Sequence, residues 1–181
     1  MLADIAQRKG VTNEFAEYFE LLHEALPNVD LLVSAFRRKR MLIVYTRYRP
    51  VHTDGRDMSV QMKARGHVFG SSSEEAALLR EVTPSAKEII IDKTCDNPFN
   101  CSPIDSVLTS RGVRCLVVCG VRCPGPVGLF SLDAADRGYH VIVVSDATAG
   151  SMRGTVQNLS GGLIRVRSTD AVIRMIGAIA E

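Results

Sequence analysis

The chain has 181 residues, of which 46% are hydrophobic and 23% are charged, and its formal net charge is +2. This length favours a single domain, residues 1–181, with a substantial core, and a charge so near zero excludes a generally basic nucleic-acid-binding surface. No stretch approaches the roughly 18 apolar residues of a membrane helix. The first residues, MLADIAQRKG, lack the apolar segment of a signal peptide. We therefore expect a cytoplasmic domain that binds neither nucleic acid nor membrane.

The first half of the chain is predicted to be mainly helical, with one strand. Apolar residues at helical spacing predict a first helix up to Pro27, which kinks or ends it, and a second helix capped by Asn28. The apolar run Met41–Thr46 predicts a strand buried on both faces. A long polar loop is expected over 47–73, and a capping box predicts a short helix over Glu74–Arg80.

The second half alternates regularly between strands and helices. Apolar runs predict four more strands: Glu88–Lys93, Arg114–Gly120, His140–Asp146 and Leu163–Ser168. Helices are predicted at 102–112, 127–137 and 170–180. This alternation indicates an α/β fold, a three-layer Rossmann-like parallel sheet with helices on both faces. Ligands of such sheets bind beyond the carboxyl ends of the strands, here after Thr46, Lys93 and Gly120.

Five cysteines could serve a metal or redox site: Cys95, Cys101, Cys115, Cys119 and Cys123. Their number is odd and no secretory signal precedes them, so we expect free thiols. Cys115 and Cys119 lie within a predicted strand with no histidine near them in sequence, which argues against zinc. His52, Asp54 and Asp57 are better explained as a solvated loop than as a metal site. We expect no metal and no other cofactor.

Two residues near the ends of predicted strands are candidates for chemistry. Cys123 lies in the turn GVRCPGPV, close to a helix N-terminus that would stabilise a thiolate and lower the thiol pKa. A small thiol packed into a turn is the alternative. Lys93 follows an apolar run and, if desolvated, could carry a proton or hold an anion. A lysine that reaches from a strand end into solvent is equally compatible with the sequence.

Four segments resemble the isochorismatase-like cysteine hydrolases, in register over residues 11–176: LPNVDLLVSAFRRKRMLIVYTRYRP, EIIIDKTCDNPFNCSPIDSVLTSRGVRCLVVCGV, DAADRGYHVIVVSDATAG and RVRSTDAVIRMI. That family includes nicotinamidases, carbamoylsarcosine and biuret-type amidohydrolases, ureidoacrylate hydrolases and vinyl-ether-cleaving isochorismatases. The resemblance implies the same fold, a small amide, ureido or related C–N or ether substrate, and an oligomer of identical chains or with a homologue.

The resemblance also implies an Asp-Lys-Cys triad, in which the cysteine attacks a carbonyl and the aspartate, aided by the lysine, accepts its proton. Lys93 corresponds to the family lysine. Pro126 stands at the nucleophile position, and it has neither a thiol nor a backbone N–H. Val121 and Arg122 lie in the loop whose N–H groups form the oxyanion hole. Cys123, three residues earlier, could replace the nucleophile only if the turn were rebuilt.

The family aspartate ends a first, central strand that has no counterpart in this sequence. The opening residues MLADIAQRKGV resemble the region after that strand, and Asp4 is a poor substitute because no strand precedes it. The resemblance thus implies a sheet without its central strand. Either the protein is longer than this chain, or the chain is a shortened paralogue that needs a partner.

Three functional hypotheses follow from the residues and the resemblance. The first is a hydrolase of small amides or related substrates, in which Lys93 assists and Cys123 attacks. The second is an inactive paralogue that binds a small molecule or pairs with an active homologue. The third is a gene fragment without a stable fold of its own. Substrate identity depends on the loop 47–73, whose sequence indicates no particular ligand.

Overall fold

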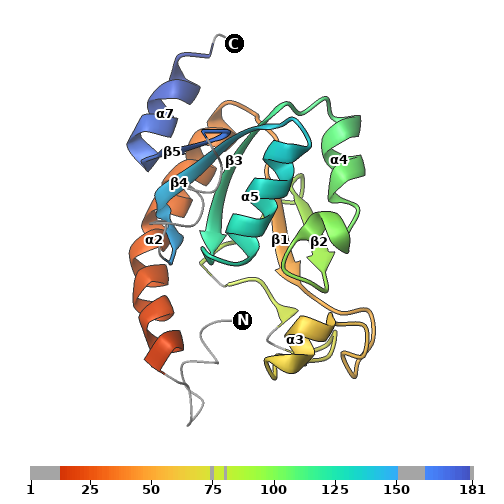
Figure 1. Ribbon diagram of the computed structural model, residues 1–181. Coiled ribbons are helices and arrows are strands. Elements are labelled where there is room, and N and C mark those ends of the chain that lie inside the picture. The colour runs from red at the N-terminus through yellow and green to blue at the C-terminus, as the bar shows by residue number, and fades with distance from the viewer. Residues whose placement is uncertain (1–12, 74–75, 80, 151–161, 180–181) are drawn as a thin grey trace.

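The computed structural model describes residues 13–73, 76–79, 81–150 and 162–179 (Figure 1). The helices are α2 (Asn13–Arg38), α3 (Val60–Ala64), α4 (Ile104–Ser110), α5 (Pro126–Asp136) and α7 (Thr169–Gly177), with a short 3-10 helix, η2 (Pro98–Asn100). The strands are β1 (Val44–Tyr48), β2 (Ile89–Lys93), β3 (Cys115–Val121), β4 (His140–Ala149) and β5 (Ile164–Arg167). Parallel strands flanked by helices confirm the predicted α/β class. No helix among the described residues is long and apolar enough to cross a membrane.

Helices cover both faces of the sheet β3-β4-β5, which confirms the three layers. On one face, Leu32 of α2 and Val172 of α7 pack against Val144 of β4. On the other face, Val127 of α5 packs against Val143 of β4, and Figure 1 shows α5 in front of β3. Both clusters meet at β4, which is therefore the centre of the core.

The strands form two separate parallel sheets, with the orders β1-β2 and β3-β4-β5. The sheets adjoin each other, because Val44 of β1, Ile91 of β2 and Leu116 of β3 belong to one hydrophobic cluster. Within the described residues, no backbone hydrogen bond joins β1 to β3. The facing edges of β1 and β3 therefore lack a strand partner there, as expected for a sheet without its central strand.

Exposure of β3 follows from this missing neighbour. Only Val118 of β3 is buried, whereas Val141, Val143 and Val144 of β4 are all buried. Among the described strands, β4 has hydrogen-bonded neighbours on both sides and β3 has one. A strand at an edge keeps part of its backbone and side chains in contact with solvent.

Helix α2 differs from the prediction of two helices separated at Pro27. It is one helix of 26 residues with Pro27 inside it. Proline removes one helical hydrogen bond, but Leu22, Leu32 and Ala35 are buried on both sides of it. Tertiary packing therefore outweighs the local preference for a break.

The segment between β1 and β2 also differs from its prediction. The loop 47–73 contains α3, which begins after Ser59, where the side-chain oxygen accepts a hydrogen bond from the N–H of Met62. The predicted helix Glu74–Arg80 falls partly outside the described residues, and 76–79 hold only a 3-10 turn and a bend. Asp57 accepts the N–H groups of Val51 and His52, as expected of a loop residue.

Candidate functional site

The candidate site lies where β1 and β2 end side by side. Tyr48 and Lys93 are the last residues of these strands and are paired in register. The Nζ atom of Lys93 lies 3.4 Å from the centroid of the Tyr48 ring, a cation–π geometry. It donates hydrogen bonds to the carbonyl oxygens of Cys95 (3.0 Å) and Asp96 (3.1 Å). Lys93 is only 3% exposed, so it does not reach into solvent.

Burial gives Lys93 an unusual titration. Removal from water disfavours the ammonium form and lowers the pKa of Lys93 to about 7, although the negative charge of Asp96 opposes this shift. A lysine with a pKa near 7 exchanges protons readily at neutral pH. Its position fits the sequence prediction, and its catalytic role stays a prediction.

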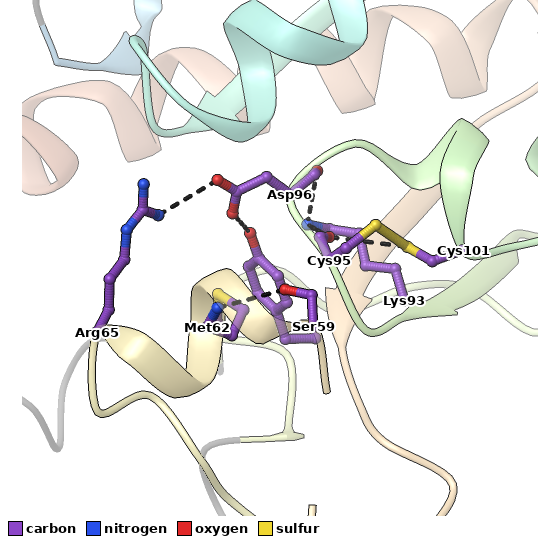
Figure 2. A network of polar contacts seen from close by, with 8 residues as sticks. Ser59, Met62, Arg65, Lys93, Cys95, Asp96 and Cys101 are labelled. Carbon is purple, nitrogen blue, oxygen red and sulfur yellow. Dashed lines mark hydrogen bonds and ion pairs between the residues drawn. A yellow bond between two sulfur atoms is a disulfide. The ribbon is translucent and has the colours of Figure 1, made fainter. Parts of the chain in front are cut away.

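Asp96 is the centre of a polar network that joins three segments (Figure 2). Its carboxylate accepts a hydrogen bond from the hydroxyl of Tyr48 and forms an ion pair with Nη1 of Arg65 at 3.3 Å. Asp96 is 7% exposed, so this charge is held by its partners. Burial, together with the hydrogen bond to Asp96, raises the pKa of Tyr48.

Helix α3 positions Arg65 beside Asp96 in this network. The N–H of Ser59 donates to the carbonyl oxygen of Thr94 at 2.9 Å, which ties the start of α3 to the loop after β2. Arg65 is the C-cap of the same short helix. Sequence reasoning missed α3 and therefore missed Arg65, and it also missed Tyr48 and Asp96. The spacing of Asp96, three residues after Lys93, was the one available signal.

A disulfide between Cys95 and Cys101 closes the loop that follows Lys93, with a Cα–Cα distance of 6.2 Å. The prediction of free thiols is therefore wrong for these two cysteines, which are separated by 6 positions in the sequence and lie close together in space. Cys115, Cys119 and Cys123 are free, as predicted. The bridge holds the carbonyl group of Cys95, which accepts one of the hydrogen bonds from Lys93.

Cys123 is placed in the core rather than in a reactive position. It is fully buried and packs in the cluster of Val127 and Val143. Desolvation raises the pKa of its thiol, so the predicted lowering of that pKa is wrong. Gly150 also packs closely against the main chain of Cys123, because a Cβ atom at Gly150 would lie 1.9 Å from the carbonyl oxygen of Cys123. The thiol is held neutral.

The turn after β3 has few free backbone donors. Pro124 and Pro126 have no N–H, and Pro126 is the first residue of α5. The N–H of Cys123 donates to a carbonyl oxygen of β4 at 2.9 Å, and the N–H of Val127 donates to the carbonyl oxygen of Arg122 at 3.2 Å. Four of the six residues from 122 to 127 therefore offer no free N–H to a bound oxyanion.

Two of the predicted loop residues face different surroundings. Val121 pairs with β4 and packs beside Leu22 of α2, so its side chain belongs to the core. Arg122 lies close enough to the polar network for its charge to oppose the rise in the pKa of Tyr48. The structure thus places the charge of Arg122 near Tyr48, which Lys93 contacts, whereas the side chain of Cys123 packs in the core.

Residues 5–165 match the isochorismatase domain. The chain belongs to the isochorismatase family. This isochorismatase-family chain is 24% identical over 165 residues to an N-carbamoylsarcosine amidase from Arthrobacter, covering 86% of the chain and 62% of that relative. It therefore spans less than two thirds of the length of that relative.

Solved structures of the isochorismatase family share the fold. A cysteine hydrolase from Pseudomonas syringae pv. phaseolicola has a TM-score of 0.77 at 23% identity, covering 87% of this chain and 82% of the other. An N-carbamoylsarcosine amidase from Thermoplasma acidophilum has a TM-score of 0.73 at 20% identity, covering 83% and 86%. These likenesses support the architecture described above.

Proposed function

We propose that this isochorismatase-family chain binds a small molecule beside Lys93 and does not hydrolyse it through a cysteine. The observation that carries the proposal is the turn after β3. Pro126 stands where the family resemblance implies a nucleophile, and Cys123 is fully buried with a raised thiol pKa. A thiol must ionise and reach the substrate before it can attack a carbonyl, and both conditions are unfavourable for Cys123.

The shortage of N–H donors in the turn after β3 also argues against hydrolysis by a cysteine. Acyl transfer places negative charge on the carbonyl oxygen, and each missing donor costs about 3 kcal/mol of transition-state stabilisation. The two prolines of the turn and its two engaged N–H groups leave little to stabilise that charge. A rebuilt turn that used Cys123 as nucleophile would have to bring its side chain out of the core cluster with Val127 and Val143.

The polar region favours a ligand with carbonyl or carboxylate groups. Arg65 and Arg122 are donors of fixed charge, and Asp96 is the acidic member of the network with Lys93. Such a group of donors suits a small amide or ureido compound that accepts several hydrogen bonds. N-Carbamoylsarcosine, to which the name of the Arthrobacter relative refers, is therefore the first probe.

Binding without turnover is the expected result. The full chain is titrated with N-carbamoylsarcosine while amide NMR signals of residues 93–97 are followed, and product formation is measured in the same samples. Saturable shifts without product support the proposal. Turnover that Cys123→Ser abolishes and Cys115→Ser leaves intact would overturn it, and so would the absence of any shift across a panel of small amides.

Thiol labelling tests the chemical step separately. With limiting iodoacetamide near neutral pH, Cys115, which is exposed, is expected to react faster than Cys123, because Cys123 is fully buried and the reagent reaches Cys115 more easily. Peptide mass spectrometry measures the two rates. Faster alkylation of Cys123 would indicate an activated nucleophile and contradict the proposal.

A further inference from the structure

A pocket lies on the face of the β1-β2 sheet opposite to the candidate site. Arg47 pairs in register with Asp92, and Tyr48 pairs with Lys93. Successive side chains of a strand point to opposite faces, so Arg47 and Asp92 face away from the Tyr48–Lys93 contact. The pocket that includes Arg47 is therefore separate from the site beside Lys93.

This pocket is lined by two arginines, three serines and two alanines, and it has a volume of about 180 Å³. The arginines are Arg47 and Arg49, the serines are 71–73 and the alanines are 76–77. Apart from the small alanine side chains, the lining consists of hydrogen-bond donors and hydroxyl groups. Such a lining suits a ligand that accepts hydrogen bonds.

The two arginines differ in their partners. Nε of Arg47 lies 2.7 Å from Oδ1 of Asp92, so that charge is compensated. Nε of Arg49 donates to the carbonyl oxygen of Ser71 at 3.2 Å, and Arg49 forms no ion pair within the described part of the chain. A guanidinium group has five N–H donors, so the hydrogen bond to Ser71 orients Arg49 and leaves its terminal nitrogens for a ligand.

Ser73 supplies a second, independent indication of a ligand. Its side-chain oxygen is buried and has no hydrogen-bond partner among the residues that the structure describes. A buried hydroxyl without a partner carries a desolvation cost unless a bound group satisfies it. An anion in the pocket would accept the hydroxyl proton of Ser73 and the N–H groups of Arg49 at the same time.

The serine loop is fixed before any ligand binds. The N–H of Ser71 donates to the carbonyl oxygen of His52 at 3.3 Å. Gly70 approaches the main chain of Thr53 so closely that a Cβ atom would lie 1.9 Å from the carbonyl oxygen of Thr53. The loop is thus held against the segment that follows Arg49, which lowers the ordering cost of binding.

We propose that this pocket binds an oxyanion, namely the phosphate or carboxylate group of a small molecule. Arg49 provides a charge that has no ion-pair partner among the described residues, and a planar fork of donors that matches either group. Ser73 provides a buried hydroxyl donor. Arg47, whose charge is paired with Asp92, also lines the pocket. This site lies apart from the one proposed beside Lys93, and its occupancy does not depend on hydrolysis.

Anion titrations of the full chain test the proposal. Sodium phosphate, sodium acetate and sodium chloride are added at constant ionic strength, and the amide NMR signals of residues 71–73 are followed. Saturable shifts with phosphate indicate a phosphate ligand, and saturable shifts with acetate alone indicate a carboxylate ligand. Both outcomes support an oxyanion site. Equal shifts with chloride, or shifts that do not saturate, would overturn it.

Substitutions assign the binding to this pocket. Arg49→Gln is expected to weaken anion binding about tenfold or more, because it removes a charge-assisted contact. Ser73→Ala leaves that charge in place and is expected to weaken binding less, which keeps the test valid if the first variant folds poorly. Arg111→Gln, an exposed arginine that follows α4, is the matched control. Binding that neither Arg49→Gln nor Ser73→Ala weakens would overturn the proposal.

Discussion

Replacing Lys93 by methionine is expected to remove a rise in the free energy of unfolding between about pH 7 and pH 10. Lysine in an unfolded chain keeps its proton up to a pKa of about 10.4, whereas folded Lys93 releases it near pH 7 because it is buried. Between these values the unfolded chain binds more protons than the folded one. The free energy of unfolding must then increase with pH, by about 1.4 kcal/mol per unit.

The contribution of Lys93 is obtained by subtracting the free energy of unfolding of Lys93→Met from that of the native chain at each pH. Below pH 7 Lys93 is protonated in both states, so its contribution is constant and the cost of burying the charge is fully present. The raised pKa values of Tyr48 and Cys119 act oppositely at high pH, since the unfolded chain then loses protons first. Subtracting the curve of Lys93→Met cancels Cys119. Tyr48 contacts Lys93 and does not cancel, but in the unfolded chain it ionises only near pH 10. Up to about pH 9 the difference therefore reports Lys93, at about 1.4 kcal/mol per pH unit.

Urea unfolding of the native chain and of Lys93→Met at several pH values provides the measurement. Lys87→Met, at an exposed position just before β2, is the matched control and should follow the native curve. Methionine fills much of the same space without a titrating group. If the curves of the native chain and Lys93→Met stay parallel from pH 7 to pH 9, Lys93 keeps an ordinary pKa and is not desolvated.

Much of the fold follows from the sequence, because apolar runs and turn residues are local signals. The predicted strands Glu88–Lys93 and Arg114–Gly120 agree with β2 and β3 within one residue at every end. Local signals failed where packing decides. Pro27 does not interrupt α2, since burial against β4 outweighs one lost hydrogen bond. Helix α3 is too short to show a clear helical period, and Ser59 was its only local marker.

The candidate site was less accessible to sequence reasoning. Lys93 could be found because it ends an apolar run at a predicted carboxyl edge. The contacts of Asp96 with Tyr48 and Arg65 join residues far apart in the chain, so no spacing reveals them. Cys123 illustrates the opposite error. Its place near a helix N-terminus indicated a lowered pKa, but its burial, which the sequence does not show, raises that pKa.

Because β1 and β3 belong to separate sheets, we expect backbone amides on their facing edges to exchange rapidly with solvent. Arg114 faces β4, because its carbonyl oxygen accepts the N–H of His140 at 2.9 Å. Backbone groups of successive strand residues point to alternate sides. The amide of Leu116 therefore points to β4, and that of Val117 points toward β1. We expect Val117 to exchange at least about a hundredfold faster than Leu116, since of these two amides only that of Leu116 points to a strand among the described residues.

Strand β1 has an edge of the same kind, which faces β3. The carbonyl oxygen of Ile43 accepts the N–H of Ile89 at 3.3 Å, so Tyr45 points to β2 and Thr46 points toward β3. Thr46 should exchange faster than Tyr45, which serves as its control on the same strand. Amide exchange of the full chain, followed by NMR, measures both pairs. Equal protection within both pairs would contradict open edges and would mean that another strand lies between β1 and β3 in solution.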